Sequence, residues 1–585
     1  MEVNEKIKLC RKLMKEEKID AYIVNTADYH QSEYIASYFK GRKFLTNFSG
    51  SAGTLVLFQD EACLWVDGRY HIQAEKELAN TEIKLFKLGN AGIPNYIEYL
   101  RDKLKDNSIL GFDEKLLLTS EILNILNNRK FIIKNFDVLE KIWKNRAKLP
   151  NGKIFILEDK YSGKPYLEKI KEIRDKLKEN KIDYNIISSL DDIAWIFNIR
   201  GNDIKSNPVS LAFSIISLKE TYLYINKAKI TKEISKYFEK NKIITKDYFE
   251  IFEDVKNLKG SILMDFNKTS YQIYNSIIDK NKVVNSINPS TYLKAHKNPT
   301  EIENTRDIHI SDAVAVTKFM YWLKTSYKTE IITEISAAEK IDTLRKEING
   351  FLDTSFTTIS AFGKNAAMAH YKADEKSNTK IKDGVFLVDS GGQYLKGTTD
   401  ITRTFFLGKV PRIKKIHNTL VLKGMLALSR AKFLSGSSGT NLDILARQFL
   451  WNENLDYKHG TGHGVGHILN VHEGPHGIRM QYNPQVLEEG MIVTNEPGVY
   501  IKDSHGIRIE NELLVKKSFE NEHGKFLEFE TLTFVPIDLD GIVKSMLNLQ
   551  EKMQLNLYHQ EVFKKVSPFL NRKEKAFLKE YTQLI

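Results

Sequence analysis

Hydrophobic positions alternate between helical and strand spacing along the first half of the chain. Apolar residues within 5–18 recur three and four positions apart, which predicts an amphipathic helix, and the apolar run Ala21 to Val24 predicts a strand directly after it. The pattern returns after residue 150 with a predicted helix over 163–180. The strands predicted after that helix are 183–187, 193–197, 210–217 and 220–225. We therefore expect two α/β segments of similar architecture, although no residue-level repeat relates them.

A different pattern begins near Glu301, where a long helical spacing starts. From there to about residue 515 the chain is rich in glycine, histidine and carboxylates, and the last sixty residues or so read as mostly helical after a strand from Leu532 to Pro536. Proline, asparagine and glycine in 147–153 predict a linker, and 288–300, which contains two prolines and two asparagines, predicts a second one. We therefore expect four parts, with the boundaries 1–150, 151–298, 299–525 and 526–585.

The overall composition excludes several classes of protein. With 42% hydrophobic and 28% charged residues, the chain has the composition of a globular protein rather than a disordered one. The net charge of +12 comes mostly from lysines, as in 171–181, that interleave with glutamates at helical spacing, so no nucleic-acid partner is expected. The two cysteines, Cys10 and Cys63, imply no disulfide framework. Without a secretory signal or a run of about 20 apolar residues, we expect a cytoplasmic protein with no membrane span.

Two aspartates stand beside apolar runs that predict neighbouring strands of one hairpin. The run 386–388 ends at Asp389, and the run 401–407 follows Asp400. Asp389 alone could be a turn-capping residue, because Ser-Gly-Gly follows it. Two buried carboxylates on adjacent strands would repel each other, however, and a divalent cation removes that repulsion.

Histidines and glutamates add further polar groups that local structure does not explain. Glu496 follows the predicted strand 491–494, and Glu510 lies within the predicted strand 507–515, where it shares a face with Arg508. The Arg508–Glu510 pair by itself could be a surface ion pair. Any single histidine could be an ordinary core or surface residue, but glycine interleaves with five of them within 18 positions: His459, His463, His467, His472 and His476.

These side chains together form an oxygen-rich, thiol-free set of hard ligands. Two aspartates, two glutamates and at least one histidine suit Mn²⁺, Co²⁺ or Zn²⁺ rather than a structural zinc site of cysteines. Four carboxylates carry four negative charges, which two divalent ions about 3.5–4 Å apart would balance. There is no His-Glu-x-x-His helix. The sequence therefore predicts a dinuclear metal centre.

The five segments that contain Asp389, Asp400, the histidines of 459–476, Glu496 and Glu510 resemble the catalytic motifs of the pita-bread metallopeptidases, the family of methionine aminopeptidase, prolidase, creatinase and aminopeptidase P. Segments that begin at Asp28, Asp191 and Phe526 resemble the first domain, the second domain and the C-terminal extension of three-domain aminopeptidase P. The resemblance implies an α/β (α+β) fold. Two creatinase-like α/β domains (1–150 and 151–298) would precede a pita-bread catalytic domain with a curved antiparallel sheet (299–525), and the extension (526–585) would pack on that domain. The metal-ligand pattern of the family falls in order on Asp389, Asp400, His463, Glu496 and Glu510.

The resemblance also implies an activity and roles for single residues. The expected reaction removes the N-terminal residue from peptides whose second residue is proline, through a hydroxide bridging two divalent metals, most often Mn²⁺. Tyr500 and Arg508 would hydrogen-bond near Asp389 and orient it. No role is implied for His467 or His476. Catalytic roles fall on His370, His459, His472 and Glu496, of which the three histidines would also bind substrate.

Two other functions remain open from the residues. A prolidase would use the same fold on Xaa-Pro dipeptides. A non-enzymatic pita-bread protein would bind a protein partner, but such modules have lost ligands that are all present in this chain. The family is commonly a homodimer, which is the oligomeric state that the resemblance implies.

Overall fold

Two six-stranded sheets organise the N-terminal half of the chain in the computed structural model, which describes residues 1–585. The first has the strand order β4-β3-β2-β1-β5-β6. The second has the order β12-β11-β10-β8-β13-β14, so each strand has a counterpart at the same position of the other sheet. The strands of the first sheet are β1 (Ala21–Asn25), β2 (Thr54–Phe58), β3 (Ala62–Val66), β4 (Ile83–Lys87), β5 (Ile109–Phe112) and β6 (Ile132–Asn135). Those of the second are β8 (Tyr184–Ile187), β10 (Ala212–Ser217), β11 (Thr221–Ile225), β12 (Ile243–Lys246), β13 (Ser261–Met264) and β14 (Lys282–Asn285).

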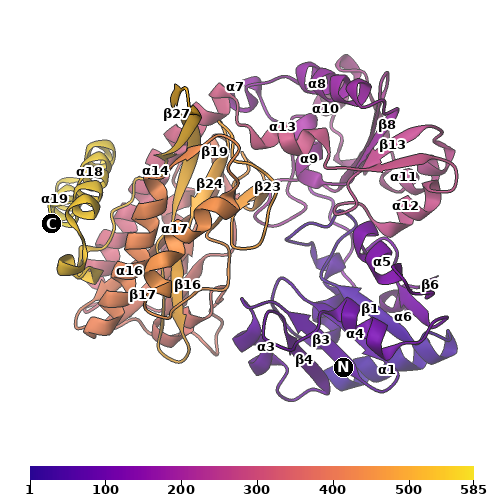
Figure 1. Ribbon diagram of the computed structural model, residues 1–585, viewed down its shortest axis with the longest axis horizontal. Helices are drawn as coiled ribbons and strands as arrows, with labels where there is room; N and C mark the ends of the chain where they lie inside the picture. The colour runs from indigo at the N-terminus through magenta and orange to yellow at the C-terminus, as the bar shows by residue number, and fades with distance from the viewer. The chain divides into compact units, whose positions relative to one another are not determined.

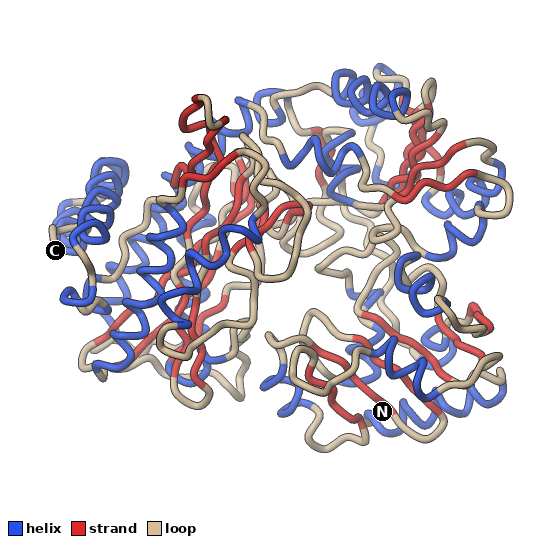
Figure 2. The backbone as a smooth tube through the Cα atoms, viewed as in Figure 1, coloured by secondary structure: helices blue, strands red, loops and turns tan.

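Helices flank each of these sheets (Figure 2). The helix that precedes the first sheet forms because its apolar residues Val3, Ile7, Cys10 and Met14 fall on one buried face, while Glu2 and the residue three positions on form a capping box. The larger helices of this half are α1 (Val3–Glu16), α3 (His71–Glu77), α4 (Tyr96–Lys103), α5 (Thr119–Leu126), α8 (Tyr166–Glu179), α9 (Leu190–Ile196), α10 (Lys232–Lys240) and α12 (Tyr271–Ile277). The helices predicted over 5–18 and 163–180 are thus α1 and α8.

The strand predicted over 193–197 is wrong, because these residues lie mainly in helix α9. Ser189 caps the helix by accepting a hydrogen bond from the backbone N–H of Asp192, and Asp191 and Asp192 stand in the first turn. Every residue from Asp192 to Ile196 is buried. An apolar run buried on all sides has no helical or strand period, so its local pattern was ambiguous.

A pair of equivalent segments, 114–120 and 266–272, joins the two N-terminal sheets. Thr119 N–H donates to the carbonyl of Thr269, and Tyr271 N–H donates to the carbonyl of Leu117 (3.0 and 2.9 Å). Ser120 N–H and Gln272 N–H donate to the carbonyls of 266 and 114 in the same reciprocal way (3.1 and 3.2 Å). Both segments follow the fifth strand of their sheet. The two N-terminal α/β segments are therefore similar, as the hydrophobic pattern predicts, and their equivalent segments pair with each other reciprocally, as if related by a two-fold axis.

Antiparallel sheets and long helices make up the C-terminal half (Figure 1). One sheet has the order β16-β17-β20 and another the order β21-β28-β27-β24-β22-β23; two further sheets have the orders β15-β18-β19 and β25-β26. The strands are β15 (Phe351–Thr354), β16 (Ile359–Phe362), β17 (Gly384–Ser390), β18 (Gly392–Tyr394), β19 (Gly397–Thr398), β20 (Ile401–Leu407), β21 (Lys432–Leu434), β22 (Gly462–Gly464), β23 (Glu473–Ile478), β24 (Ile492–Asn495), β25 (Gly498–Ile501), β26 (His505–Arg508), β27 (Asn511–Asn521) and β28 (Gly524–Thr531). The helices are α13 (Pro289–Ala295), α14 (Pro299–Ser326), α15 (Glu334–Lys346), α16 (Arg412–Ser429), α17 (Gly439–Trp451), α18 (Leu549–Val566) and α19 (Arg572–Tyr581).

The hydrophobic core of this half includes the C-terminal extension. Val562 and Val566 of α18 and Leu578 of α19 are buried in one cluster with Phe319 of α14 and Phe386 of β17. The mixed α/β fold predicted from the sequence is confirmed. None of the helices combines the length and the apolar character that crossing a membrane requires.

Three local expectations in this half are wrong. β17 and β20 pair along their whole length, but they are not one hairpin, because the chain between them makes β18 and β19 of another sheet. The strand predicted over 507–515 is broken, since β26 ends at Arg508 and β27 begins at Asn511. The strand predicted over 532–536 is not formed, because β28 ends at Thr531 and side chains rather than a neighbouring strand bind the carbonyls of Val535 and Pro536.

Candidate metal centre

The five residues of the expected ligand pattern converge from distant parts of the C-terminal half. β17 and β20 pair so that the residue opposite Asp389 is Thr402, which places Asp400 just beyond the end of that ladder. β22 and β27 are both neighbours of β24. Asp389 lies in β17, Asp400 directly before β20, His463 in β22, Glu496 directly after β24, and Glu510 in the two-residue corner between β26 and β27.

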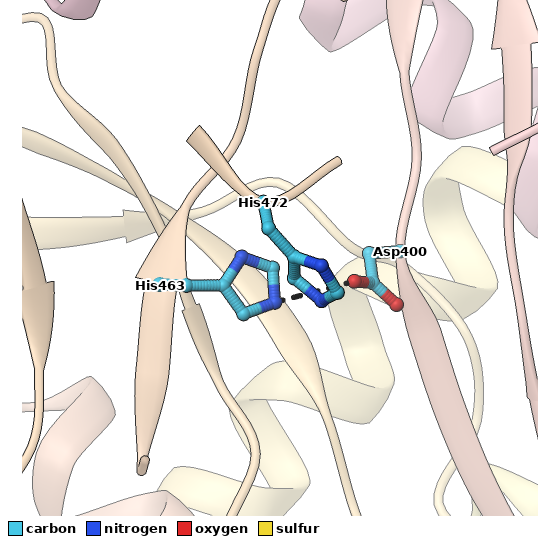
Figure 3. Close-up of side chains that lie close together, drawn as sticks. All are labelled: Asp400, His463 and His472. Atoms are coloured by element: carbon cyan, nitrogen blue, oxygen red, sulfur yellow. Dashed lines mark ion pairs between the residues drawn. The ribbon is translucent and has the colours of Figure 1, made fainter. Parts of the chain in front are cut away.

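Their side-chain atoms form overlapping groups that could hold metal ions. Within each group all the potential ligand atoms lie within 4.8 Å of one another. The Nε2 atom of His463 lies 3.5 Å from Oδ2 of Asp400, as drawn in Figure 3, and 3.7 Å from Oε1 of Glu496. The groups are Asp389–Asp400–Glu510, His463–Glu496–Glu510 and Asp400–His463–His472.

The donor set fits divalent metal ions. Four carboxylates and an imidazole converge without a thiol, and both cysteines, Cys10 and Cys63, are buried in the first N-terminal sheet region. One carboxylate oxygen, Oδ1 of Asp389, is buried without a hydrogen-bond partner. A buried carboxylate oxygen that accepts no hydrogen bond is costly, and a metal ion would remove that cost.

The pKa shifts of the clustered carboxylates also indicate a site for divalent metal ions. Burial and the charge of neighbouring Asp389 raise the pKa of Asp400 to about 6, although a hydrogen bond from His463 opposes the rise. Burial and nearby carboxylates raise the pKa of Glu510 well above its ordinary value, and burial also raises the pKa of Glu496. These carboxylates therefore resist carrying their negative charges together without added positive charge.

A backbone hydrogen bond fixes the orientation of the His463 ring. Its Nδ1 lies 2.9 Å from the carbonyl oxygen of Gly464, and since a carbonyl only accepts, Nδ1 carries the proton. Nε2 then faces the carboxylates. Burial would lower the pKa of His463, but the hydrogen bond to Asp400 and the charge of Glu496 raise it to about 9. In the metal-free protein Nε2 is protonated at neutral pH, and a metal ion would take the place of that proton.

A chain of hydrogen bonds runs from Asp389 through Arg508 and Tyr500 to His459. Arg508 donates through Nη2 to Oδ2 of Asp389 (2.6 Å) and through Nη1 to the Tyr500 hydroxyl (2.5 Å). His459 Nδ1 donates to the carbonyl of Gly460 (2.7 Å), so its Nε2 accepts from the Tyr500 hydroxyl (2.8 Å). Burial raises the pKa of Tyr500 to about 12 despite Arg508, so the phenol keeps its proton. Arg508 and Glu510 are both buried, which excludes the surface ion pair considered above.

The other predicted histidines occupy three kinds of position. His472, directly before β23, packs its ring edge-on against His463 with ring centres 4.3 Å apart (Figure 3). His370 lies half-buried in the turn after the 3₁₀ helix Gly363–Ala367 and belongs to none of the three ligand groups. His467 and His476 hydrogen-bond to the backbone carbonyls of Tyr161 and Ile492, at 3.1 and 2.9 Å, and so support the fold.

The sequence did not reveal several residues that support the cluster. Glu512 accepts a hydrogen bond from the backbone N–H of Asp400 (2.7 Å), and its other oxygen lies 3.2 Å from Nε2 of His309 in α14. Thr402 donates its hydroxyl proton to Glu510 (2.7 Å). Glu512 could have been found, since it stands two positions after Glu510 in an apolar strand. His309 gave no signal, because it lies on an ordinary helix distant in sequence.

Comparisons with known proteins identify the family of the chain. Metallopeptidase family M24 matches residues 303–517, and the C-terminal region of peptidase M24 matches 525–585. The Creatinase/Prolidase N-terminal domain matches twice, over 6–147 and 145–301. The probable Xaa-Pro aminopeptidase P of Paracoccidioides brasiliensis is 38% identical over 100% of both chains. Xaa-Pro aminopeptidase 1 of Dictyostelium discoideum is 37% identical over 97% of this chain and 94% of its own.

Solved structures give the same result. The X-prolyl aminopeptidase of Caenorhabditis elegans, described as a cytosolic enzyme with a di-nuclear active site, matches with a TM-score of 0.96 and 34% identity over 100% of both chains. The prolidase of Pyrococcus horikoshii OT3 matches only 64% of this chain, but 99% of its own, with a TM-score of 0.50 and 25% identity. The chain therefore belongs to metallopeptidase family M24, among its members of the Xaa-Pro aminopeptidase P type.

Proposed function

We propose that the protein is a metal-dependent aminopeptidase that removes the N-terminal residue from peptides whose second residue is proline. The observation that carries this proposal is the convergence of four carboxylates and His463 in overlapping groups, in which Oδ1 of Asp389 is buried without a hydrogen-bond partner. The names of the relatives aligned along the whole chain support the substrate class.

The metal ions would be held by the five residues of the ligand pattern. Two divalent ions would balance the four carboxylates, and we propose Mn²⁺ as the native metal, with Co²⁺ and Zn²⁺ as alternatives. When bound, such ions lower the pKa of a coordinated water to about 7 and polarise the carbonyl of the scissile bond. The proposed ligands are Asp389, Asp400, His463, Glu496 and Glu510.

The other residues of the site would bind substrate and move protons. Glu496, whose carboxylate lies 3.8 Å from Nδ1 of His459, would accept a proton from the attacking water. His472 would stabilise the negative charge that develops on the scissile carbonyl oxygen. His459 would help to bind the substrate. Arg508 would hold Asp389 in its ligating orientation through the 2.6 Å hydrogen bond, and Tyr500 would support Arg508 and His459.

We further propose that His370 contributes to the pocket for the proline ring. The 3₁₀ helix before it packs against β26, where a Cβ on Gly506 would overlap the carbonyl of Ala366. A peptide bond to proline has no N–H, so the enzyme needs no acceptor at that position and can surround the ring with apolar contacts. This feature would distinguish substrates with proline from those without it.

The organisation of the whole protein follows from the same proposal. The four parts 1–150, 151–298, 299–525 and 526–585 would be two N-terminal domains, the catalytic domain and its extension, in accord with the four family matches. We propose a cytoplasmic homodimer that acts on peptides. Light scattering on the purified protein would measure its mass, and a monomer would refute the dimer.

Hydrolysis of matched peptides tests the proposed function. The protein should cleave Arg from Arg-Pro-Pro much faster than it cleaves the dipeptide Arg-Pro; the reverse preference would indicate a prolidase. Asp400→Ala should abolish turnover while the circular dichroism spectrum stays that of the wild type. Asp307→Ala, which removes an exposed carboxylate paired with Lys396 at 2.8 Å, is the matched control and should remain active. Full activity of Asp400→Ala would contradict the ligand assignment.

A further inference from the structure

Arg403 is a buried arginine of β20 that touches the corner carrying Glu510. Its side chain is 2% exposed. Through Nη1 it donates to the backbone carbonyls of Glu510 (2.6 Å) and Thr402 (2.9 Å). Through Nη2 it donates to Oδ1 of Asn511, the first residue of β27 (2.8 Å). The guanidinium therefore holds Glu510 and Asn511 at the point where the chain leaves one sheet and enters another.

The C-terminal extension supplies the remaining acceptors of this guanidinium. Arg403 donates to the carbonyls of Val535 (2.8 Å) and Pro536 (3.2 Å) and to the hydroxyl of Tyr558 in α18 (2.9 Å). The Tyr558 hydroxyl in turn donates to the carbonyl of Val535 (2.6 Å). Backbone carbonyls that would otherwise enter a strand ladder thus point at one cation.

The charge of Arg403 makes this arrangement unusual for a purely structural group. All six acceptors are uncharged, and a buried guanidinium without a carboxylate partner is costly. The carboxylate closest to Arg403 in the sequence is Asp400 of the cluster, three positions before it. Arg403 also binds the peptide carbonyl of Glu510, another residue of the cluster. The rigid fork of a guanidinium also fixes several acceptors in one geometry, which an ammonium group cannot do.

We propose that Arg403 and Tyr558 are positioning residues of the metal centre, through which the C-terminal extension holds Glu510 in place to bind metal. Glu510 lies between two strands, so its carbonyl has no place in the ladder of β27 and is fixed by Arg403. Removal of this support would let the corner move and displace the carboxylate. The inference rests on the proposed function, because it takes Glu510 to be a metal ligand.

Binding of Co²⁺ to the metal-free, full-length protein tests this proposal. The visible absorption of bound Co²⁺ reports its coordination, and titration gives its affinity. Arg403→Lys keeps the charge but not the fork, and should bind Co²⁺ about 10- to 100-fold more weakly and with an altered spectrum. Tyr558→Phe removes one hydroxyl and should weaken binding by about tenfold, at the lower end of that range. Tyr581→Phe is the matched control, since it removes a tyrosine hydroxyl of the same extension that donates to Asp540 (2.8 Å), and it should bind as the wild type does.

Circular dichroism identifies which variants fold. If Arg403→Lys does not fold, Tyr558→Phe alone decides the question. Folded variants with a lower melting temperature but the wild-type affinity and spectrum for Co²⁺ would overturn the proposal, because Arg403 would then only stabilise the fold. Failure of the proposed function is a distinct result, since the wild-type protein itself would bind no Co²⁺.

Discussion

The hydroxyl of Thr402 is shared between two charged side chains of the metal centre. It donates to Oε2 of Glu510 (2.7 Å) and accepts from Nε of Arg508 (3.1 Å). Arg508 reaches Asp389 with another nitrogen, so one small side chain links the supports of two carboxylates. Both of these carboxylates belong to the same ligand group.

The substitution Thr402→Val removes this link while it keeps the side-chain shape. We expect a 10- to 100-fold lower kcat/KM, the range typical of residues that support metal ligands, with metal affinity reduced in parallel. Steady-state kinetics and titration of the metal-free variant would measure both. Thr419→Val, which removes a buried hydroxyl that donates to the carbonyl of Lys415 (2.7 Å), is the control. Equal kinetics for Thr402→Val and wild type would show that the hydroxyl has no such role.

Protons and metal ions compete for the same atoms in the cluster. Burial raises the pKa of Asp400 to about 6, above its unfolded value of 3.8, so the folded metal-free protein holds this proton more tightly than the unfolded chain does. The contribution of Asp400 to the stability of the metal-free protein is therefore greatest below pH 3.8 and is lost as the pH rises to about 6. The metal ions need the deprotonated carboxylate and a neutral His463, whose pKa is raised to about 9.

Metal binding should therefore release protons and strengthen as the pH rises from 5 to 8. The increase in melting temperature on addition of a fixed concentration of Mn²⁺ should be large at pH 7.5 and small at pH 5. Thermal unfolding of the metal-free protein, with and without Mn²⁺, measures the difference directly. A stabilisation by Mn²⁺ that is the same at both pH values would contradict the predicted competition.

The sequence predicted those residues of the site that stand in local motifs. Asp389, Asp400, Glu496 and Glu510 were found because each stands beside or within an apolar run, and the resemblance to the pita-bread family selected His463 from the five histidines; the structure brings these side chains together in overlapping groups. Thr402 and His309 were not found. Their importance depends on partners distant in sequence, such as Glu512 for His309, and no local pattern records such a pairing.

Glycine in the histidine segment lets strands approach closely around His463. A Cβ on Gly462 would overlap the backbone oxygen of Thr494 in the neighbouring strand β24. The hydroxyl of the same Thr494 accepts a hydrogen bond from the backbone N–H of His463 (3.1 Å). A Cβ on Gly460 would meet its closest neighbour, the carbonyl of Ile478, at an ordinary 3.4 Å. Neither glycine has a positive φ. Of these two glycines, only Gly462 is therefore required by packing.

Two alanine substitutions test this difference. Gly462→Ala should push β22 away from β24, at a cost of about 1–3 kcal/mol in stability, and should displace His463. Since a misplacement of about 1 Å can cost about 10²-fold in rate, we expect a comparable loss of kcat/KM. Gly460→Ala should keep both stability and activity. Thermal unfolding and peptide assays on the two variants measure this difference. Equal stability and equal kcat/KM for Gly462→Ala and Gly460→Ala would contradict the prediction.

The limits of prediction at the scale of elements have a common physical cause. The strands around 386–388 and 401–407 were predictable because their apolar runs are bounded by turn residues. The break at residues 509 and 510 was not, because the chain there changes its partner from β25 to β24 without a turn residue. Residues 193–197 became a helix because a cap at Ser189 and tertiary burial decided an ambiguous apolar run.

At the scale of the whole molecule, the two N-terminal sheets show how a fold can repeat without a readable sequence repeat. Their strand orders correspond position by position, and their equivalent segments 114–120 and 266–272 exchange reciprocal backbone hydrogen bonds. Hydrophobic periodicity alone predicted two similar halves. The reciprocal contact was not predictable, since main-chain groups form it and these are the same for every sequence.

The dependence of peptide hydrolysis on metal tests the central claim most directly. The protein is stripped with a chelator, the chelator is removed, and the release of arginine from Arg-Pro-Pro is measured before and after addition of Mn²⁺. We predict no release from the metal-free protein and full recovery as the bound metal approaches two ions per chain. Release at the full rate without metal, or no release with any divalent metal supplied, would contradict the account.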